Sequence, residues 1–438
     1  MATGKSGGLT NGYPWLSAVP SAWKARKVSS MCYVHGRIGF KGYSRQDLVS
    51  NEAPGAAVVF GGTNIEKNGT LDYEVLSFLS LQKYLESPEI ALNGGEILMT
   101  KVGAGVGDCA IYDGRFERAT INPNVLIIEP KSPDISADFL RYRLISSDAQ
   151  LEIHRESTKA GAQPAINQAY VKRLRVSIPV LAEQQFIVEF LNRKTAEIDA
   201  LIEKLSLQVE LLERYRRELI AHTVTHGLDP DAPMRDSGID WVGKIPQHWK
   251  MLRIASLYDE RSTKVSDQDF LPLSVTMQGI LPQIETVAKT NDGDNRKLIK
   301  KGDFVINSRS DRRGACGIAD RDGSCSLINT VLRPQQSIHN PFFNYLFRSN
   351  VFADEFYKWG HGIVDDLWTT RWTDMKVIQV PVPPIAEQRM IAEFLKTRTA
   401  QLDLTILNIN KQIELLGKYR KQVINDAVTG KVRVEGAE

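Results

Sequence analysis

The stretch PVLAEQQFIVEFL, residues 179–191, returns almost unchanged as PPIAEQRMIAEFL at residues 383–395. The match continues without a gap, residues 182–225 aligning with residues 386–429, and 20 of the 44 aligned positions are identical. A chain that carries one long segment twice, with dissimilar residues between the copies, is organised as two related halves.

The repeated segment has the periodicity of a coiled-coil helix. Apolar residues recur every seven positions, namely Leu191, Ile198, Leu205, Leu212 and Leu219, then Leu395, Leu402, Ile409, Leu416 and Val423. Ile202 and Val209, with Ile406 and Ile413, widen the apolar stripe beyond a narrow seam. The second seam position is predicted half a heptad on and is more polar, with Lys194, Leu201, Gln208 and Tyr215, then Arg398, Thr405, Gln412 and Tyr419. The alternative is a long helix inside one core. However, about 43 helical residues at ~1.5 Å each span roughly 65 Å, which exceeds the core of a small domain.

The repeat extends beyond the helix. WLSAVPSAWK (15–24) returns as WVGKIPQHWK (241–250), and GGEILMT (94–100) is echoed by KGDFVIN (301–307). Each member of the second pair is typical of a glycine–acid turn followed by a buried strand. Between the halves, HGLDPDAPMRDSGID (226–240) is dense in Gly, Pro and Asp, which indicates a linker.

These features predict a tandem repeat of two mixed α/β (α+β) globules and two long helices, with the helices paired antiparallel about an approximate twofold axis. The predicted parts are a first globule over 1–180, a helix over 181–226, a linker over 227–240, a second globule over 241–384, a helix over 385–430 and a tail over 431–438.

The composition is that of a folded protein, and its small net charge means that any anionic partner must be bound by a local basic patch. The 438 residues are 42% hydrophobic and 24% charged, and the net charge is only +3. The four cysteines (Cys32, Cys109, Cys316 and Cys325) have none of the usual zinc spacings, so we expect reduced thiols rather than a disulfide or metal site. The amino terminus lacks the apolar core of a secretory signal and no apolar run approaches ~18 residues, so we expect a cytoplasmic protein.

Motifs that suggest catalysis are weak. GAGVGD (103–108) resembles part of a dinucleotide or S-adenosylmethionine fingerprint, but the following CAIYDGRFE predicts a hairpin rather than the required helix. NPFF (340–343) lacks the second proline of the adenine-methyltransferase tetrad and opens a helical stretch. His222 and His226 share a helical face and could ligate a metal, but two cations near a helix C-terminus also suit its dipole. We therefore predict no catalytic residues and no metal site.

Two basic segments are candidates for DNA contact. YVHGRIGFKGYSR (33–45) presents Arg37, Lys41, Tyr43 and Arg45 on a glycine-rich loop, a composition suited to phosphate contact and base-edge reading. The alternative is an ordinary solvated loop. Lys101, directly after the first predicted strand, is a further candidate.

In the second globule, NSRSDRRG (307–314) follows a strand and presents Arg309, Arg312 and Arg313. Arginine suits bidentate contact with guanine or phosphate, although salt bridges within the surface would explain the same residues. Residues 158–167 and 358–368 precede the helices at equivalent places, and we expect them to complete each reading surface.

The doubled pattern resembles the specificity subunits of type I restriction–modification systems. The resemblance is carried by IPQHW (245–249), its weaker copy VPSAW (19–23), the linker-and-entry string at 227–249 and the two proline–LAEQ/IAEQ helix starts. VPSAW lacks the histidine of the second copy, which affects only the expected packing of the entry segment. TAEI (195–198) and TAQL (399–402) are similar to the spacer repeat of such helices.

The resemblance implies two target recognition domains, each reading one half of a split double-stranded DNA sequence. It further implies two methyltransferase subunits that methylate adenine, docked on the helices, and separate ATP-dependent restriction/translocase subunits. S-adenosylmethionine, ATP and Mg²⁺ would then bind to these partners only. The alternatives are a coiled-coil scaffold without DNA sequence specificity and, third, a fused enzyme.

Some repeated helix residues recur although the globules diverge, which suggests a partner common to both halves. The candidates for partner binding are Glu183, Gln184, Tyr215 and Arg216 in the first helix, and Glu387, Gln388, Tyr419 and Arg420 in the second. The alternative is that they hold the helices to each other.

Overall fold

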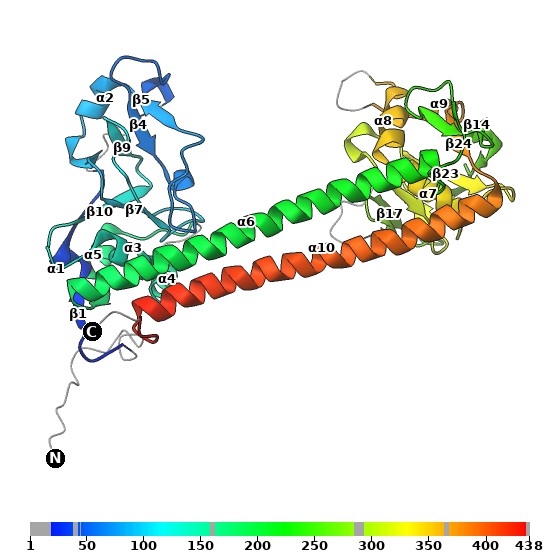
Figure 1. Cartoon of the computed structure of the whole chain (residues 1–438). Helices are drawn as coiled ribbons and strands as arrows, with labels where there is room; N and C mark the ends of the chain where they lie inside the picture. The colour runs from blue at the N-terminus through cyan, green and yellow to red at the C-terminus, as the bar shows by residue number, and fades with distance from the viewer. Residues whose placement is uncertain are drawn as a thin grey trace. The chain divides into compact units, whose positions relative to one another are not determined.

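The computed structural model describes residues 19–37, 43, 45–157, 163–283, 293–362 and 368–434. The chain separates into two compact units: unit 1 contains residues 1–204 and 412–438, and unit 2 contains residues 205–411. Each unit therefore combines one globule with the start of one long helix and the end of the other (Figure 1). Among the described residues, no helix is both long and apolar enough to cross a membrane.

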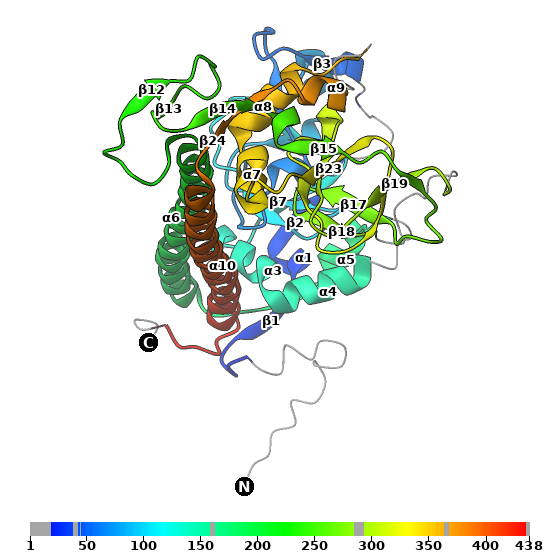
Figure 2. The same cartoon turned by 90° about the vertical axis from the view of Figure 1, so that its right-hand side faces the viewer.

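The two long helices are present as predicted. Helix α6 spans Leu181–His226 and helix α10 spans Ile385–Val428. In each unit the start of one packs beside the end of the other, and Figure 2 shows the two ribbons side by side. In unit 1, Ile187 and Leu191 share a core with Val428.

Ion pairs fix the antiparallel register in each unit. In unit 1, Arg420 of α10 donates to both carboxylate oxygens of Asp199 of α6, at 2.8 and 3.1 Å. In unit 2, Nε of Arg216 lies 3.0 Å from Oδ1 of Asp403. The two pairs occupy equivalent positions of the repeat, so the two helices have the same antiparallel register in each unit.

The predicted seam is correct at its first set of positions and wrong by one residue at its second set. Leu201, Gln208 and Tyr215 are exposed, as are Arg398, Thr405, Gln412 and Tyr419. The less exposed positions one residue further on are Thr195, Ile202, Val209 and Arg216, then Thr399, Ile406, Ile413 and Arg420. The polar members of the seam are thus two buried threonines and two ion-paired arginines.

Unit 1 is built around a four-stranded antiparallel sheet that is covered on both faces. Its order is β2 (Cys32–His35), β10 (Val125–Pro130), β7 (Ile97–Thr100), β8 (Cys109–Ile111). Ile97 and Met99 pack toward the helices, whereas Leu98 packs toward a second sheet. Burial on both faces explains why the central strands β7 and β10 read as continuous apolar runs.

The second sheet of unit 1 has five strands and includes one parallel pair, β4 (Ala57–Phe60) with β9 (Ala119–Ile121). Figure 1 shows β4, β5 (Ser77–Leu79) and β9 on one side of the central sheet, and α1 (Val28–Met31), α3 (Ala137–Ile145), α4 (Ser147–Ser157) and α5 (Gln168–Arg173) on the side of the long helices. Its order is β3 (Leu48–Val49), β5 (Ser77–Leu79), β4 (Ala57–Phe60), β9 (Ala119–Ile121), β6 (Ala91–Leu92). The remaining elements are β1 (Lys24–Lys27) paired with β11 (Arg175–Ile178), helices α1 (Val28–Met31), α2 (Leu81–Leu85), α3 (Ala137–Ile145), α4 (Ser147–Ser157) and α5 (Gln168–Arg173), and short turns η2 (Arg45–Asp47), η3 (Gly62–Asn64) and η4 (Pro88–Ile90).

Unit 2 repeats this plan with different residues. Its four-stranded sheet has the equivalent order β15 (Tyr258–Glu260), β23 (Asn329–Pro334), β20 (Phe304–Asn307), β21 (Cys316–Ile318). The smaller sheets are β16 (Lys264–Val265) with β19 (Arg296–Ile299) and β22 (Gly323–Cys325), β17 (Leu273–Thr276) with β18 (Gly279–Pro282), β12 (Met234–Asp236) with β13 (Lys244–Pro246), and β14 (Lys250–Arg253) with β24 (Gln379–Val382). The helices are α7 (Asn340–Arg348), α8 (Asn350–Lys358) and α9 (Trp372–Met375), with turns η6 (Ile254–Ser256) and η7 (Ser310–Arg312).

The predicted glycine–acid turns precede equivalent strands in the two units. The Glu96 carboxylate accepts bonds from the amides of Asn93 and Gly94, both at 2.8 Å, just before β7. The Asp303 carboxylate accepts a bond from the amide of Lys300, also at 2.8 Å, just before β20. A carboxylate that holds a turn closed by its backbone donors explains why both copies keep an acid there.

The repeated entry motifs and helix starts meet in each unit. The Trp23 indole donates to Glu183 at 3.1 Å in unit 1, and the Trp249 indole donates to Glu387 at 3.0 Å in unit 2. We call these two contact sets entry joints. Joint 1 contains Trp23, Glu183 and Gly430, and joint 2 contains Trp249, Glu387 and Gly227.

A glycine after each long helix closes the joint. Gly227 has φ +81° and Gly430 has φ +68°, values that favour glycine. A Cβ on Gly430 would lie 2.5 Å from the Pro20 ring, and one on Gly227 would lie 3.0 Å from the Glu387 carboxylate. The end of each helix therefore packs on the entry segment of the opposite copy.

Candidate nucleic-acid interface

Two loops occupy equivalent places at the ends of equivalent strands. The β7–β8 loop (residues 101–108) begins at Lys101, and the β20–β21 loop (residues 308–315) carries the predicted arginines. Each is paired with the segment that precedes a long helix, through a Val102–Ala165 bridge in unit 1 and an Arg309–Thr369 bridge in unit 2. The globules thus present two different loops on one shared framework.

The arginines of the β20–β21 loop differ in how strongly they are held by ion pairs with neighbouring aspartates. Arg309 donates to both oxygens of Asp311, at 3.0 and 3.1 Å, and Arg313 pairs with Asp354. Arg312 is 67% exposed and reaches Asp311 only at 3.9 Å. The alternative of salt bridges within the surface therefore applies to Arg309 and Arg313. Arg312 is the arginine of this loop best placed to contact a ligand.

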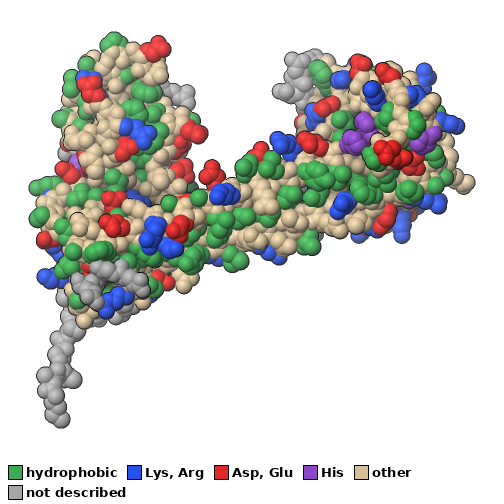
Figure 3. All heavy atoms as spheres, viewed as in Figure 1, with side chains coloured by type: hydrophobic (Ala, Val, Ile, Leu, Met, Phe, Trp, Pro, Cys, Tyr) green, Lys and Arg blue, Asp and Glu red, His purple; other side chains and the backbone are tan. Residues whose placement is uncertain are grey.

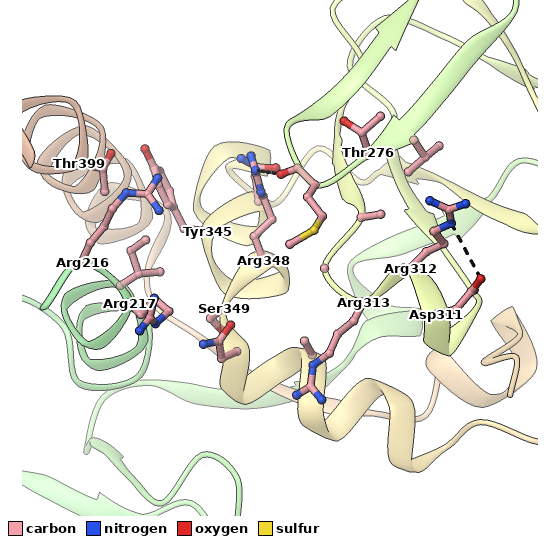
Figure 4. A pocket seen from close by; sticks show the side chains of 18 residues that line it. Arg216, Arg217, Thr276, Asp311, Arg312, Arg313, Tyr345, Arg348, Ser349 and Thr399 are labelled. Carbon is pink, nitrogen blue, oxygen red and sulfur yellow. Dashed lines mark hydrogen bonds and ion pairs between the residues drawn. The ribbon is translucent and has the colours of Figure 1, made fainter. Parts of the chain in front are cut away.

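A basic pocket lies beside this loop. Its volume is about 740 Å³, and its walls come from the β17–β18 turn, the β20–β21 loop, the α7–α8 junction and both long helices. The lining includes Asp311 and five arginines: Arg216, Arg217, Arg312, Arg313 and Arg348. In Figure 4, Arg348 lies between the arginines of α6 and those of the loop. We call this site the arginine pocket.

The sequence did not point to Arg217 or Arg348 as site residues. Arg217 follows the Tyr215–Arg216 pair directly, and Arg348 is the last residue of α7. Arg216 was a candidate for partner binding, but the structure places it in the pocket wall. These residues come together only through packing of the globule against α6, for which the local sequence has no signal.

In the first globule, Arg37 and Tyr43 lie together, with the guanidinium carbon 5.6 Å from the ring centre. Burial raises the pKa of Tyr43, an effect that Arg37 partly offsets. Lys101 is half-buried, and desolvation lowers the pKa of its ammonium. Arg45 opens η2, and Lys41 lies outside the described residues.

The two glutamines predicted to bind a partner are interior residues. Gln184 is fully buried; it accepts a bond from the Ser136 amide and donates to the Asp134 and Pro179 carbonyls. Gln388 is 1% exposed, accepts from the His339 amide and donates to the Pro383 carbonyl. In this conformation neither amide can contact another subunit directly.

The other partner candidates divide into two groups. Glu183 and Glu387 bond to the joint tryptophans, and Arg216 and Arg420 pair with aspartates across the helices. These contacts match the alternative in which repeated residues hold the helices and globules together. Tyr215 and Tyr419 are 52% and 53% exposed and remain candidates for partner contact.

The motifs that were considered for catalysis serve structural roles in the fold. GAGVGD forms the loop between β7 and β8, so a strand follows its glycines instead of the helix that the fingerprint requires. The hairpin expected within CAIYDGRFE is wrong, because β8 pairs back with β7 and β9 belongs to the other sheet. Phe342 and Phe343 of NPFF are core residues at the start of α7. His222 and His226 stack with ring centres 4.5 Å apart, and burial, followed by the neighbouring His222, lowers the pKa of His226. Among the described residues, no cluster of three or more His, Cys, Asp or Glu side chains could hold a metal ion.

The four cysteines are free and buried, as expected for reduced thiols. Burial raises the pKa of Cys32 and Cys316 to about 12 and that of Cys325 to about 11. Such thiols carry little thiolate at neutral pH and are poor nucleophiles.

Comparison with known proteins matches both halves of the chain to one family. Residues 20–211 and 246–415 match the type I restriction modification DNA specificity domain. The chain belongs to the type I specificity subunits. It carries two DNA-recognition domains in tandem, and nothing in the comparisons supports a scaffold without DNA specificity.

Relatives of this specificity subunit extend over most of its length. It is similar to a putative type I restriction enzyme MjaX specificity subunit of Methanocaldococcus jannaschii, 24% identical over 440 residues, covering 96% of each chain. The EcoKI specificity subunit of Escherichia coli K12 is 25% identical over 209 residues, covering 44% of this chain and 45% of that one.

Solved structures share the fold. A chain from a study of complex assembly and conformational transition in the type I R-M system has a TM-score of 0.66 at 14% identity, covering 94% of this chain and 99% of that one. The HsdS subunit from Thermoanaerobacter tengcongensis has a TM-score of 0.54 at 15% identity, covering 94% and 98%. The tandem arrangement of this specificity subunit therefore follows a known architecture.

Proposed function

We propose that this specificity subunit reads a bipartite DNA target, with one half-site for each globule, and docks one methyltransferase subunit on each half of its helix pair. The observation that carries the proposal is the equivalence of the two units. Both have the same central sheet order and the same entry joint, while the loops after β7 and β20 differ. A shared framework with different loops suits two readers with different half-sites.

The second reading surface is the arginine pocket with the β20–β21 loop. Arginines suit both guanine edges in the major groove and backbone phosphates. On a chain whose net charge is only +3, five arginines around one pocket form the local patch that a polyanion requires. We assign Arg37, Tyr43 and Lys101 to the first reading surface, together with Lys41 and Arg45.

The helices offer equivalent apolar surfaces for a protein partner. Leu207, Leu211 and Tyr215 lie at four-residue spacing on α6, and Leu415 and Tyr419 are the repeat equivalents of the last two on α10. All five are more than 40% exposed, and Figure 3 shows hydrophobic side chains gathered over both helices. Exposed apolar side chains that recur in the repeat favour a partner that binds twice.

We assign the chemistry to the partners. Methyl transfer to adenine, with S-adenosylmethionine, would occur on the methyltransferase subunits, and ATP and Mg²⁺ would act on the restriction/translocase subunit. Supporting this assignment, the glycines of GAGVGD turn a hairpin and the aromatics of NPFF fill a core, so neither motif presents the groups that methyl transfer needs. This chain would select the DNA sequence at which the reaction takes place.

Replacing Arg312 by alanine tests the second reading surface. If Arg312 reads a base, the complex with its methyltransferase should lose about 1–3 kcal/mol of binding free energy and relax its preference at one position. If Arg312 meets a phosphate, affinity should fall equally for all sequences and the salt slope should fall by about one. Titration of target and scrambled duplexes by fluorescence anisotropy at several salt concentrations separates these results.

The matched control is Arg321→Ala. Arg321 is 50% exposed and pairs with Asp320 in the same globule, but it does not line the arginine pocket. We expect this variant to bind as the wild type does. Wild-type affinity together with a wild-type salt slope for Arg312→Ala would remove the β20–β21 loop from the DNA interface.

A further inference from the structure

The arginine pocket joins a recognition domain to the long helix. Arg312 and Arg313 belong to the β20–β21 loop, whereas Arg216 and Arg217 belong to α6. Figure 4 shows the α6 arginines on one side of the pocket and the loop arginines on the other, with Arg348 between them. A ligand in this pocket would touch the repeated helix and the variable globule together.

The charges favour an anion. Asp403 and Asp354 pair with Arg216 and Arg313, and Asp311 is shared by Arg309 and Arg312. Arg217 is exposed and has no ion pair within the described part of the chain. The lining therefore keeps an excess of positive charge, and its 740 Å³ exceeds what one small ion fills, which fits a stretch of sugar–phosphate backbone.

The equivalent place in unit 1 is arranged differently. Arg420 is the repeat equivalent of Arg216; it bonds to both oxygens of Asp199 and also donates to the carbonyl of Asn68, at 3.0 Å. Its side chain is 12% exposed, compared with 38% for Arg216. In unit 1, a loop of the first globule accepts a hydrogen bond from Arg420 of the helix. In unit 2, the equivalent Arg216 lines the arginine pocket.

We propose that α6 is itself a DNA-binding element: Arg216 and Arg217, with Arg348 and Arg312, hold a phosphodiester stretch of the target next to the second half-site. This inference rests on the proposed function, because it assumes that the second globule reads DNA. It adds that the helix grips the DNA backbone at the second domain and not equivalently at the first. The contact is independent of sequence because phosphates carry no base information.

The test compares Arg217→Ala with Lys421→Ala in the specificity subunit assembled with its methyltransferase. Lys421 is the repeat equivalent of Arg217 and is also exposed, so the two variants remove the same charge from the same helix position in opposite halves. Binding to target and scrambled duplexes is measured by anisotropy between about 50 and 200 mM salt.

We expect Arg217→Ala to weaken binding to both duplexes roughly three- to tenfold near physiological salt and to lower the salt slope by about one. Phosphate ethylation interference should disappear at a position flanking the second half-site. Lys421→Ala should leave affinity and slope at wild-type values.

Three results would overturn the inference. The first is an unchanged slope for Arg217→Ala, and the second is an equal loss for Lys421→Ala, which would indicate general electrostatics. The third is a loss of bound methyltransferase without a change in slope, which would assign the pocket to an acidic protein segment. In each case a wild-type complex that still discriminates target from scrambled duplex leaves the proposed function standing, whereas failure of that discrimination defeats the proposed function itself.

Discussion

Replacing Trp249 by alanine should lower the free energy of unfolding of unit 2 by about 3–5 kcal/mol. Trp249 is 1% exposed and packs edge-on against Phe342, with ring centres 6.4 Å apart. Its indole donates to Glu387 and its ring lies against Gly227, so one side chain links the globule, the start of α10 and the end of α6. The substitution leaves a cavity and removes a donor from the Glu387 carboxylate.

Hydrogen exchange read by mass spectrometry measures this effect locally. Protection should fall in peptides covering residues 241–260, the start of α7, the start of α10 and the end of α6, while unit 1 keeps its protection. Trp23→Ala is the matched variant, because Trp23 makes the equivalent bond to Glu183 and packs against Phe139, and it should produce the mirror-image pattern. A loss below about 1 kcal/mol for Trp249→Ala would mean that joint 2 does not hold the unit together.

The second large effect is expected on subunit stoichiometry. The double substitution Leu211→Ala and Tyr215→Ala should reduce the bound methyltransferase from two copies to one. Truncation of two central contacts costs about 4 kcal/mol in a typical interface, roughly a thousandfold in affinity. Alanine suits an exposed helix, so the fold should be kept.

Leu415→Ala with Tyr419→Ala is the equivalent change in the other half. Native mass spectrometry should show one methyltransferase on each double variant and none on the combination. Substitutions at Gln184 or Gln388 are unsuited to this test, because their buried amides bond to the backbone and their loss would disturb the fold. Two copies retained on both double variants would assign docking to another surface.

Much of the architecture could be predicted because the chain contains it twice. The aligned copies indicate both long helices, and the paired glycine–acid turns indicate equivalent strands before the sheets are known. The sequence identifies the entry tryptophans and the Glu–Gln helix starts as separate repeated features, but it does not predict that Trp and Glu meet in one joint. The partners of the two glutamines, Ser136 and His339, lie 48 and 49 residues before them and carry no repeated motif.

The sequence places the second seam position one residue too early, although it includes Ile202 and Val209 in the apolar stripe, and the reason is physical. A seven-residue period is equally satisfied by Leu201, Gln208 and Tyr215 or by Ile202, Val209 and Arg216, because both sets lie beside the first apolar row. The choice is made by contacts from outside the helix. Tyr142 of the first globule approaches Thr195 at 3.3 Å, and Asp403 pairs with Arg216.

The arginine pocket was only partly predictable for a similar reason. Arg312 and Arg313 stand in one basic run, but Arg217 and Arg348 come from two different helices, and no local sequence pattern indicates that they share a pocket with this run. Base contacts depend on where such side chains meet in space. The target sequence is therefore beyond a prediction from the chain alone.

The most direct test of the central claim is sequencing of modified bases in the genome of a host that carries this chain with its partner subunits. One half-site for each globule predicts methylated adenines in a two-part motif with an unread spacer, and it predicts that exchange of residues 241–384 for those of a relative changes only one part. A continuous motif, or an exchange that alters both parts together, would contradict the account.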